Sequence, residues 1–547
     1  MTTIVETTDA ASNGSTQYAM VAGDVFFGTA SSGATDWIAV TLVAGHTYSF
    51  GAVGMGAVGS GVTDPFLKLR DANGTVLRQN DDGGPGFSAD LSFTAVTSGT
   101  YYIEVKALYG ATNGAYGLVL TEGDRPSYGV ELGAAVLYRD GSSWAATPET
   151  AVVVSWGVRA SGPAEDAGGN AAPFSVLSTA QIGATERALD MYAEVGNISF
   201  NRVNPGGTTN SATILVGGYT ATDDGAGAYA YFPGSTAWAN SDGDLWINND
   251  SVSTTSIPVG SYDYFVFLHE LGHAMGLDHP GDYNAAPGVT ITYDNAAQFV
   301  EDSQQYSVMS YFYATDTEAR APTSYCDTLM LYDIFAIQEM YGVNSGTRSG
   351  NDTYGFHATT PGGAYDFTVN TDPLMCIWDG AGIDTLDLSG FGGRQLIDLN
   401  DGAFSNVGGF RGNLSIALGA QIENAVGGRG SDRIYGNELG NVLRGGRGID
   451  ILFGDLGNDR LSGNAGADGF FFLHGGGRDR ITDFNKLQDM ISLSSDLWGG
   501  ATKTEAEVVA EFAKIRNGVV VFDFGADELT LLGVGSVSGL ADAIVLF

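Results

Sequence analysis

Basic residues, cysteines and long apolar runs are all scarce in this sequence. Lysine and arginine number 24 against 63 aspartates and glutamates, and the formal net charge of −39 argues against nucleic acid and anionic membranes as partners. No apolar run approaches the length that crosses a bilayer, so we expect no membrane span. The amino terminus, Met1-Thr-Thr-Ile-Val-Glu6, has neither a basic start nor an apolar core, so we expect no conventional signal peptide.

The two cysteines, Cys326 and Cys376, are too few for a disulfide scaffold. They are compatible with one bridge or with two buried thiols, and we favour the thiols. The chain of 547 residues is too long for one core, and its 44% hydrophobic residues, with 28 Phe and 25 Tyr, indicate a folded protein rather than an acidic disordered tail. Such an excess of acid requires cations, and calcium is the obvious candidate.

The composition divides the chain into five stretches. They are a leader (1–17), short alternating strands (18–122), a connector (123–149), a mixed stretch of strands and helices (150–343) and a Gly- and Asp-rich stretch (344–547). The mixed stretch should hold helices over about 178–195, from about 262, and over about 328–341. We therefore predict a multidomain α+β and all-β fold: a β-sandwich, a mixed α/β domain and a repetitive β-structure.

The strongest signal is His269-Glu-Leu-Gly-His273-Ala-Met-Gly276-Leu-Asp-His279. Residues four apart share one face of a helix, so His269 and His273 can bind one metal ion, and Gly276 lets the chain turn to bring in His279. Three protein nitrogens leave one position open, which is typical of catalytic zinc. Glu270 stands beside the first ligand, where it can act on water as a general base without ligating. A helix with incidental histidines is the alternative, and the spacing strongly disfavours it.

This spacing is the signature of the metzincin proteases, which predicts a methionine turn downstream. Ser307-Val-Met309-Ser-Tyr311 supplies one, with Met309 as an apolar floor beneath the ligands. With His279-Pro-Gly-Asp-Tyr-Asn284 and Asp333-Ile-Phe-Ala-Ile-Gln338, the chain from about residue 150 onward resembles the serralysin family. The resemblance implies that Tyr311 ligates zinc in the resting enzyme, swings away during turnover and helps to stabilise the oxyanion. It also implies an edge strand that binds substrate, matched by Tyr229, Ala230 and Tyr231.

From residue 427 onward, units of nine residues repeat, and this repeat is typical of a calcium-binding parallel β-roll. Glycine turns expose carbonyl oxygens and aspartates add carboxylates, while Ile434, Leu443, Leu452 and Leu461 should point into a thin core. A glycine-rich disordered linker is the alternative, but the phase is kept over five units. In the second nonapeptide Asn441 replaces the aspartate, so this turn should bind calcium weakly or not at all. The predicted ligands are Gly428, Gly430, Asp432, Gly446, Gly448, Asp450, Gly457, Asp459, Gly466 and Asp468.

The serralysin resemblance implies a further calcium site between the catalytic domain and the roll. Its ligands would be Arg348, Gly350, Asp352, Asp379, Gly382, Asp384 and Glu423, with Asp352 where the family usually has threonine. Calcium binding would drive folding outside the cell, since the clustered aspartates repel each other without it. The last residues, Asp542-Ala-Ile-Val-Leu-Phe547, resemble the tail recognised by a one-step (type I) exporter, although an ordinary final strand would look similar.

Residues 18–122 resemble the bacterial pre-peptidase C-terminal domain, through Asp64-Pro-Phe-Leu-Lys-Leu-Arg-Asp71 and Asn80-Asp-Asp82. These acids either bind another calcium ion or serve only as turn residues. The domain could dock substrate, assist folding or block the cleft, and because no cysteine precedes Cys326, no thiol upstream of the catalytic stretch can hold the zinc in a latent state.

We therefore predict a secreted, monomeric zinc endopeptidase that cleaves proteins or peptides. A calcium-dependent adhesive protein with an inactive protease-like domain is the main alternative, and a zinc hydrolase for non-peptide substrates is the other.

Overall fold

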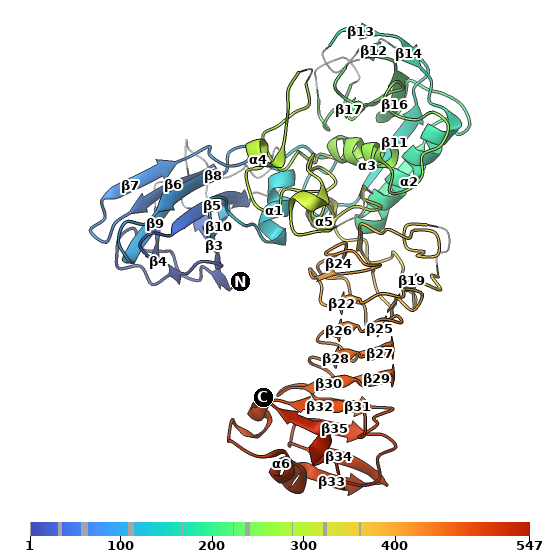
Figure 1. Cartoon of the computed structure of the whole chain (residues 1–547). Helices are drawn as coiled ribbons and strands as arrows, with labels where there is room; N and C mark the ends of the chain where they lie inside the picture. Colours follow the sequence, from blue (N-terminus) through green and yellow to red (C-terminus); the bar gives the residue numbers. More distant parts are fainter. Residues whose placement is uncertain are drawn as a thin grey trace. The chain divides into compact units, whose positions relative to one another are not determined.

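The structure is a computed structural model that describes residues 2–30, 35–55, 64–107, 114–139, 141–162, 164–165, 169–222, 224–235, 241–286, 288–320, 325–359 and 363–547. The chain divides into two compact units (Figure 1). The first contains Met1–Thr317 and Leu329–Asn344, and the second contains Glu318–Thr328 and Ser345–Phe547. Within the described residues, no helix is both long enough and apolar enough to span a bilayer.

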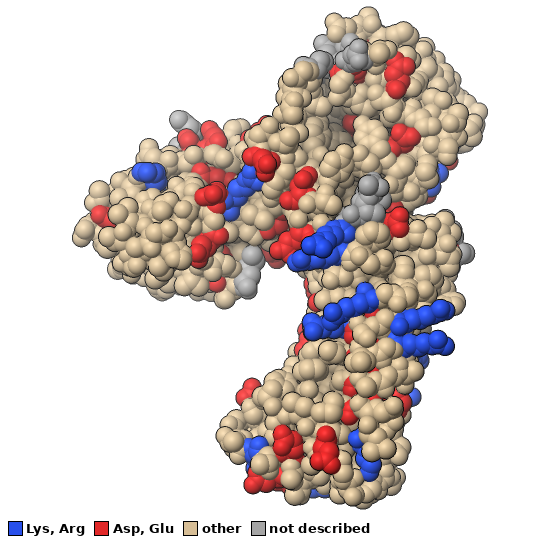
Figure 2. Space-filling view, viewed as in Figure 1, with Lys and Arg blue, Asp and Glu red and all other residues tan. Residues whose placement is uncertain are grey.

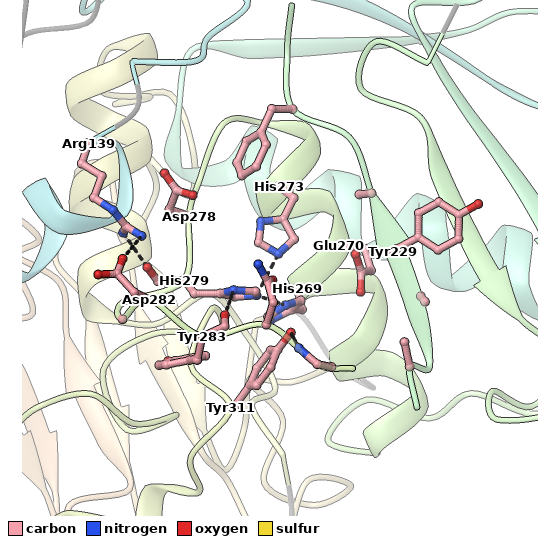
Figure 3. Close-up of a pocket in the computed structure, with 17 residues that line it drawn as sticks. Arg139, Tyr229, His269, Glu270, His273, Asp278, His279, Asp282, Tyr283 and Tyr311 are labelled. Atoms are coloured by element: carbon pink, nitrogen blue, oxygen red, sulfur yellow. Dashed lines mark hydrogen bonds and ion pairs between the residues drawn. The ribbon is translucent and has the colours of Figure 1, made fainter. Parts of the chain in front are cut away.

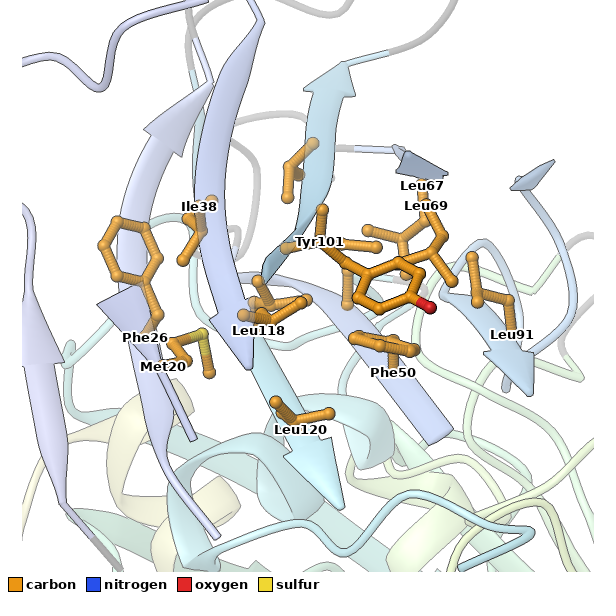
Figure 4. Close-up of a cluster of buried hydrophobic side chains, with 14 of the residues drawn as sticks. Met20, Phe26, Ile38, Phe50, Leu67, Leu69, Leu91, Tyr101, Leu118 and Leu120 are labelled. Atoms are coloured by element: carbon orange, nitrogen blue, oxygen red, sulfur yellow. The ribbon is translucent and has the colours of Figure 1, made fainter. Parts of the chain in front are cut away.

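The first unit begins with a sandwich of two five-stranded sheets. One sheet has the order β1 (Thr3–Val5), β3 (Val25–Ala30), β10 (Gly114–Glu122), β5 (Thr47–Met55) and β8 (Ala89–Thr94). The other has the order β2 (Ala19–Met20), β4 (Asp36–Leu42), β9 (Gly99–Ala107), β6 (Pro65–Arg70) and β7 (Val76–Asn80). Alternate residues of each strand point inward, so that Phe26, Ile38, Phe50, Leu67 and Leu118 form a core with no solvent exposure (Figure 4).

Two of the stretches contain regular structure that the sequence did not indicate. The residues expected to form a leader contribute β1, which pairs in parallel with β3. The strand is short and its partner is distant in the sequence, so no hydrophobic pattern indicates this pairing. The stretch expected to be a connector contains helix α1 (Val130–Leu137), six of whose residues are buried. Its sequence is apolar almost all round, which is typical of a helix enclosed on all sides.

The rest of the first unit is an α/β region built on a mostly parallel sheet. The order is β15 (Ile198–Arg202), β11 (Val152–Val158), β16 (Ile214–Tyr219), β18 (Leu245–Asn248) and β17 (Ala228–Ala230), with β14 (Phe174–Ser175) beside β16. β17 runs antiparallel to β18 and forms one edge of the sheet. β12 (Ala164–Glu165) and β13 (Ala171–Ala172) form a separate short hairpin.

The three predicted helices are present as α2 (Thr179–Val195), α3 (Tyr262–Ala274) and α5 (Leu331–Tyr341), with the shorter α4 (Tyr293–Ala296) and η1 (Ala314–Asp316). Ser178 and Gln181 form the expected capping box at the start of α2. Helix α3 packs on α2, where the Tyr192 hydroxyl donates a hydrogen bond to the Leu268 carbonyl at 2.7 Å. This packing holds α3 against the body of the unit.

The second unit is a roll of two parallel sheets, with a small third sheet of β20 (Met375–Ile377), β24 (Leu414–Ile416) and β23 (Phe404–Ser405). The first parallel sheet contains β19 (Thr353–Gly355), β21 (Thr385–Asp387), β25 (Asn424–Val426), β27 (Val442–Arg447), β29 (Arg460–Ala465), β31 (Arg478–Ile481) and β35 (Glu528–Leu531), then β34 (Val519–Asp523) and β33 (Ala513–Arg516) antiparallel. The second contains β22 (Leu396–Asp398), β26 (Arg433–Tyr435), β28 (Ile451–Phe453), β30 (Gly469–Phe472), β32 (Met490–Leu493) and β36 (Ile544–Leu546). Outside the sheets lie α6 (Glu505–Phe512), η2 (Ser495–Trp498) and η3 (Ala541–Ala543).

Two nonapeptides make one turn of the roll. Ile434 pairs with Leu452 in one sheet and Leu443 with Leu461 in the other, and all four are buried, as the repeat predicted. On the sheet that carries β26, β28 and β30, the rings of Tyr435, Phe453 and Phe471 stack with centroids 4.6 and 4.2 Å apart.

The charged side chains are unevenly distributed. On the face shown in Figure 2, acidic side chains are scattered over both units and many of the basic ones gather on the roll. Arg433, Arg460 and Arg478 on its strands are exposed. Cys326 and Cys376 are both buried thiols, as favoured from the sequence.

Candidate metal centre

Helix α3 carries two of the three predicted ligands. Ser261 caps its start, because the serine side-chain oxygen accepts a hydrogen bond from the Tyr264 N–H at 3.2 Å. His269 and His273 lie one turn apart and are buried on the same side of the helix.

The third ligand depends on a glycine turn directly after the helix. Gly276 has a φ of +100°, and a Cβ atom there would lie 2.1 Å from the Ser142 carbonyl oxygen. Both the backbone conformation and the lack of space require glycine at this position. The chain therefore reverses, and His279 faces the two imidazoles of α3.

The three imidazoles converge on one point (Figure 3). Nε2 of His279 lies 3.2 Å from Nε2 of His269 and 3.1 Å from that of His273. Tetrahedral bonds of about 2.0–2.1 Å place neighbouring nitrogen ligands about 3.4 Å apart. The spacing of the three nitrogens therefore fits a zinc ion, with a fourth position left for water or substrate.

Backbone carbonyls orient each ring. Nδ1 of each histidine donates to one carbonyl, so that Nε2 keeps its lone pair for a metal. The pairs are His269 with Val308 at 2.8 Å, His273 with Leu277 at 2.7 Å and His279 with Tyr283 at 2.8 Å. Burial lowers the pKa of His269 to about 4 and that of His273 to about 3, and lowers the pKa of His279 well below its usual value. All three rings are thus neutral near pH 7, as metal ligation requires.

Glu270 and Tyr311 lie beside the imidazoles and line the same cavity. Burial raises the pKa of Glu270 to about 8, so its carboxyl group is able both to accept and to release a proton near neutral pH. The ring of Tyr311 lies with its centroid 4.6 Å from that of His279, and burial raises the pKa of its hydroxyl, which therefore stays protonated.

The methionine turn lies directly under α3. A Cβ atom on Gly272 would lie 2.3 Å from the sulfur of Met309, which is fully buried. Asp333, at the start of α5, holds this turn by accepting hydrogen bonds from the Ser307 hydroxyl at 2.6 Å and the Val308 N–H at 2.7 Å. Because the Val308 carbonyl orients His269, Asp333 acts on the metal centre through the turn.

The cavity at this centre has a volume of about 690 Å³. Tyr229 and Ala230 of the edge strand β17 line it, as does Phe232, whereas Tyr231 lies one residue beyond the strand and is not among the described residues that line it. Arg139 and Asp282 line its other end, and Figure 3 draws them on the side of the histidines away from Tyr229.

Three carboxylates of the second unit lie where the family resemblance implied a calcium site. The ligand atoms of Asp352, Asp379 and Asp384 lie within 4.8 Å of one another. Oδ2 of Asp384 is buried and accepts no hydrogen bond from any described residue, and the Asp384 N–H donates to Glu423 at 2.7 Å. A Cβ atom on Gly382 would lie 1.8 Å from the Gly350 carbonyl oxygen.

Asp352 also accepts a hydrogen bond from the Thr359 hydroxyl at 2.6 Å, and Arg348 is the remaining predicted ligand of this site. Arg348 has a φ of +45°, an unusual conformation for a residue with a side chain.

The aspartates of the repeats form ladders along the roll. The Asp432 N–H donates to Asp450 at 2.8 Å, and the Asp450 N–H donates to Asp468 at 2.9 Å. Oδ2 of Asp450 and Oδ2 of Asp459 are buried and accept no hydrogen bond from any described residue. Burial, together with Asp432 and Asp468, raises the pKa of Asp450 to about 7. A buried oxygen without a hydrogen bond and a carboxylate that resists ionisation are both typical of a cation-binding site.

The glycines of these turns bring carbonyl oxygens close to the next coil. A Cβ atom on Gly446 would lie 2.3 Å from the Gly428 oxygen, and one on Gly448 would lie 2.1 Å from the Gly430 oxygen. A Cβ atom on Gly466 would lie 1.6 Å from the Gly448 carbonyl oxygen. Gly457 has a φ of +118° and also faces a carbonyl of the preceding coil.

The turn at Asn441 differs from its neighbours. The Asn441 side-chain amide donates to the Glu423 carbonyl at 3.0 Å and to Asn437 at 2.8 Å, and its oxygen accepts from the Asn437 N–H at 2.8 Å. These bonds use both amide hydrogens and the amide oxygen, so the Asn441 side chain is saturated by hydrogen bonds within the described residues.

Comparison with known proteins agrees with this geometry. The Matrixin model matches residues 174–314, and the Peptidase M10 serralysin C-terminal model matches residues 343–531. The metallopeptidase AprA of Pseudomonas marginalis is 39% identical over 441 residues, which cover 78% of this chain and 90% of that protein. The serralysin of Photorhabdus laumondii is 41% identical over 350 residues, covering 62% of this chain and 71% of that protein. The chain belongs to the serralysin family. This serralysin is thus a zinc metalloendopeptidase that acts on protein substrates.

One solved structure resembles a part of this serralysin: the pre-peptidase C-terminal domain of a collagenase from Bacillus anthracis. It is 18% identical, covers 19% of this chain and 93% of that chain, and has a TM-score of 0.16.

Some groups in this serralysin were not found from the sequence. Arg139 acts on the site through a backbone contact that leaves no motif, and Asp333 lies in a segment matched to the family but was assigned no role from the sequence. In the sandwich, Glu6, Asp9 and Asp36 have ligand atoms within 4.8 Å of one another, although their spacing in sequence follows no pattern. Oδ1 of Asp36 is buried without a hydrogen bond from any described residue. By contrast, Asp71 accepts from the Asn73 and Thr75 N–H groups, as a turn residue does.

Proposed function

We propose that His269, His273 and His279 hold the catalytic zinc and that Glu270 is the general base. The observation that carries the proposal is the spacing of the three Nε2 atoms beside a buried carboxyl group, in a cavity bordered by an edge strand. When bound, zinc supplies the Lewis acidity that activates water and polarises the scissile carbonyl. Glu270 accepts the proton of the attacking water and delivers it to the leaving amine.

Tyr311 and β17 act on the substrate. In this proposal the Tyr311 hydroxyl, which burial keeps protonated, donates a hydrogen bond to the developing oxyanion. The proposed role of Tyr311 as a further ligand in the resting enzyme is supported by its ring, whose centroid lies 4.6 Å from that of His279. The backbone of Tyr229 and Ala230 can pair with an extended substrate, which adds a strand to the sheet. Tyr231 belongs to the same edge but contributes through its packing on Tyr229.

Calcium is proposed as the structural cofactor of the second unit. The unpartnered carboxylate oxygens of Asp384, Asp450 and Asp459 support this assignment, as do the carbonyls of the glycine turns. The domain boundaries at 17, 122, 149 and 343 remain proposals, as do the pre-peptidase-like nature of the sandwich and the monomeric state. We also propose secretion to the extracellular space through a type I exporter that recognises the carboxy-terminal tail, where β36 lies.

The test is the hydrolysis of casein and of a quenched fluorescent peptide by the calcium-loaded protein. Removing zinc with a transition-metal chelator should abolish cleavage, and zinc, but not additional calcium, should restore it. Metal content is measured in parallel by mass spectrometry. Undiminished hydrolysis by protein shown to be zinc-free would refute the proposal. The same assay separates the adhesive alternative, which predicts no hydrolysis, from a peptidase; the intact Glu270 and histidine set speak against that alternative.

A further inference from the structure

The amino-terminal sandwich is attached to the α/β region through helix α1, which is enclosed on two sides. A Cβ atom on Gly117 of the sandwich would lie 2.1 Å from Leu132 of α1. On the opposite side, a Cβ atom on Gly133 of α1 would lie 2.1 Å from the ring of Tyr332 in α5. Glycines on both sides of the helix allow an approach that leaves no space for solvent or sliding.

Buried hydrogen bonds fix the same junction. The hydroxyl of Tyr128, just before α1, donates to Asp90 of the sandwich at 2.8 Å, and the Tyr128 carbonyl accepts from the Tyr332 hydroxyl at 2.8 Å. Glu301 accepts from the Tyr128 N–H at 2.8 Å. Tyr128 is only 2% exposed, so separating the two regions would leave these polar groups without partners.

A second contact joins the sandwich to the loop that carries the third histidine. The Gly86 N–H donates to Asp282 at 3.0 Å, and Arg139 lies close to both residues, with its guanidinium 3.6 Å from the Asp282 carboxylate. Arg139 also donates to the His279 carbonyl at 2.6 Å. The sandwich thus contacts the partners of a zinc ligand, while none of its described residues lines the cavity.

We propose that the sandwich is a permanent brace of the loop from His279 to Tyr283, and not a removable cover of the cleft. The part concerning zinc rests on the proposed ligation by His279. Gly86 and Arg139 restrain the loop through their contacts with Asp282 and His279, and α1 keeps the sandwich in place. Removal of the sandwich would leave Asp282 and Arg139 without this restraint, so that His279 would be held less firmly.

The first experiment cuts the chain without unfolding it. A recognition site for a specific protease is inserted after Asp124, which is exposed. After cleavage we expect the two fragments to co-elute in size-exclusion chromatography and to retain the zinc content of the uncut protein. Separate elution of the sandwich fragment under native conditions would overturn the proposal, whatever the outcome for the activity.

The second experiment measures zinc loss to a chromophoric chelator. In Gly86→Ala, the new methyl group would lie 2.6 Å from Cδ of Arg139 and displace it, and we expect zinc to be lost about 10- to 100-fold faster. Gly45→Ala is the matched control, because Gly45 is also a sandwich glycine at positive φ, but no described atom lies within 4 Å of its Cβ position. Its zinc release should equal that of the unmodified protein.

If Gly86→Ala does not fold, Asp282→Ala removes the same contact from the other side and should speed zinc release in the same way. Unchanged release in these variants would overturn the brace. Failure of the unmodified protein to hold zinc would instead refute the proposed function, so the two failures are distinguishable.

Discussion

The zinc centre and the turns of the roll prepare for their ions in opposite ways. At the zinc centre each imidazole is neutral and is oriented by a backbone carbonyl, so the geometry stands without the metal. In the roll, buried carboxylates face one another, and Asp450 and Asp459 each keep an oxygen that accepts no hydrogen bond from any described residue. The first site is preorganised, whereas the second is completed only by its ligand. The fold therefore should tolerate the loss of zinc and not the loss of calcium.

The largest effect is expected from Glu270, which tests whether the zinc centre separates binding from chemistry. Glu270→Ala should lower kcat/KM roughly 10²–10⁴-fold, because no other group replaces the proton acceptor. Zinc content should remain unchanged, since the glutamate orients no histidine. Peptide hydrolysis and metal analysis measure both quantities. Glu270→Gln, which keeps the shape, should lose activity to the same extent, and an active Gln variant would contradict the role of general base.

Removal of calcium tests whether the roll, unlike the zinc centre, needs its ions to keep its structure. In calcium-free buffer with micromolar zinc, strands β26, β28 and β30 should lose protection from hydrogen exchange, because the carboxylates repel one another. Peptides from α3 should keep their protection. Equal loss of protection in both regions would show that the zinc centre also depends on calcium.

A smaller effect is expected at Gly276, because this residue supports the zinc centre through its backbone conformation and not through a charged group. Gly276→Ala should lower the free energy of unfolding by about 2–4 kcal/mol, because a methyl group would meet Ser142 O at 2.1 Å at a φ of +100°. Gly288→Ala is the control, at a φ of +80° and with no described atom within 4 Å, and should lose about 1 kcal/mol. Denaturant titration compares the two variants, and equal values would show that the close contact is unimportant.

The smallest expected change is a difference of one in the number of calcium ions that the roll binds. Asn441→Asp removes the amide that closes the turn and adds a carboxylate, so native mass spectrometry should find one more calcium ion per molecule. Asp450→Asn makes the reverse exchange and should lose at least one ion. If Asn441→Asp gains nothing while Asp450→Asn loses calcium, the Asn441 turn is closed for another reason than its amide.

The sequence was most informative where function requires a fixed local spacing. His269, His273, Gly276 and His279 lie within eleven residues, so the ligand geometry is largely encoded by one helix and one turn. The buried Ile434 and Leu443 could likewise be assigned from the nonapeptide phase alone.

Contacts between distant segments could not be found in this way. β1 forms by pairing with β3, and α1 is a helix because the sandwich and α5 enclose it. Asp333 acts on His269 through a turn 25 residues earlier in the chain, and Arg139 reaches His279 across 140 residues. Such contacts follow from tertiary packing, which a single sequence does not reveal.

The stacked rings of Tyr435, Phe453 and Phe471 also determine the register in which the coils of the roll wind. Successive nonapeptides are so alike that the chain could wind half a turn out of phase, with every glycine and aspartate still in a suitable place. The alternate nonapeptides form the opposite sheet. There, the positions equivalent to these aromatic residues carry Val426, Arg444 and Ser462, which pair with one another along that sheet. A winding error of one unit would insert a guanidinium or a hydroxyl between two rings and abolish their contact. The aromatic column thus distinguishes even units from odd ones, and makes the correct winding the only one in which all three rings meet.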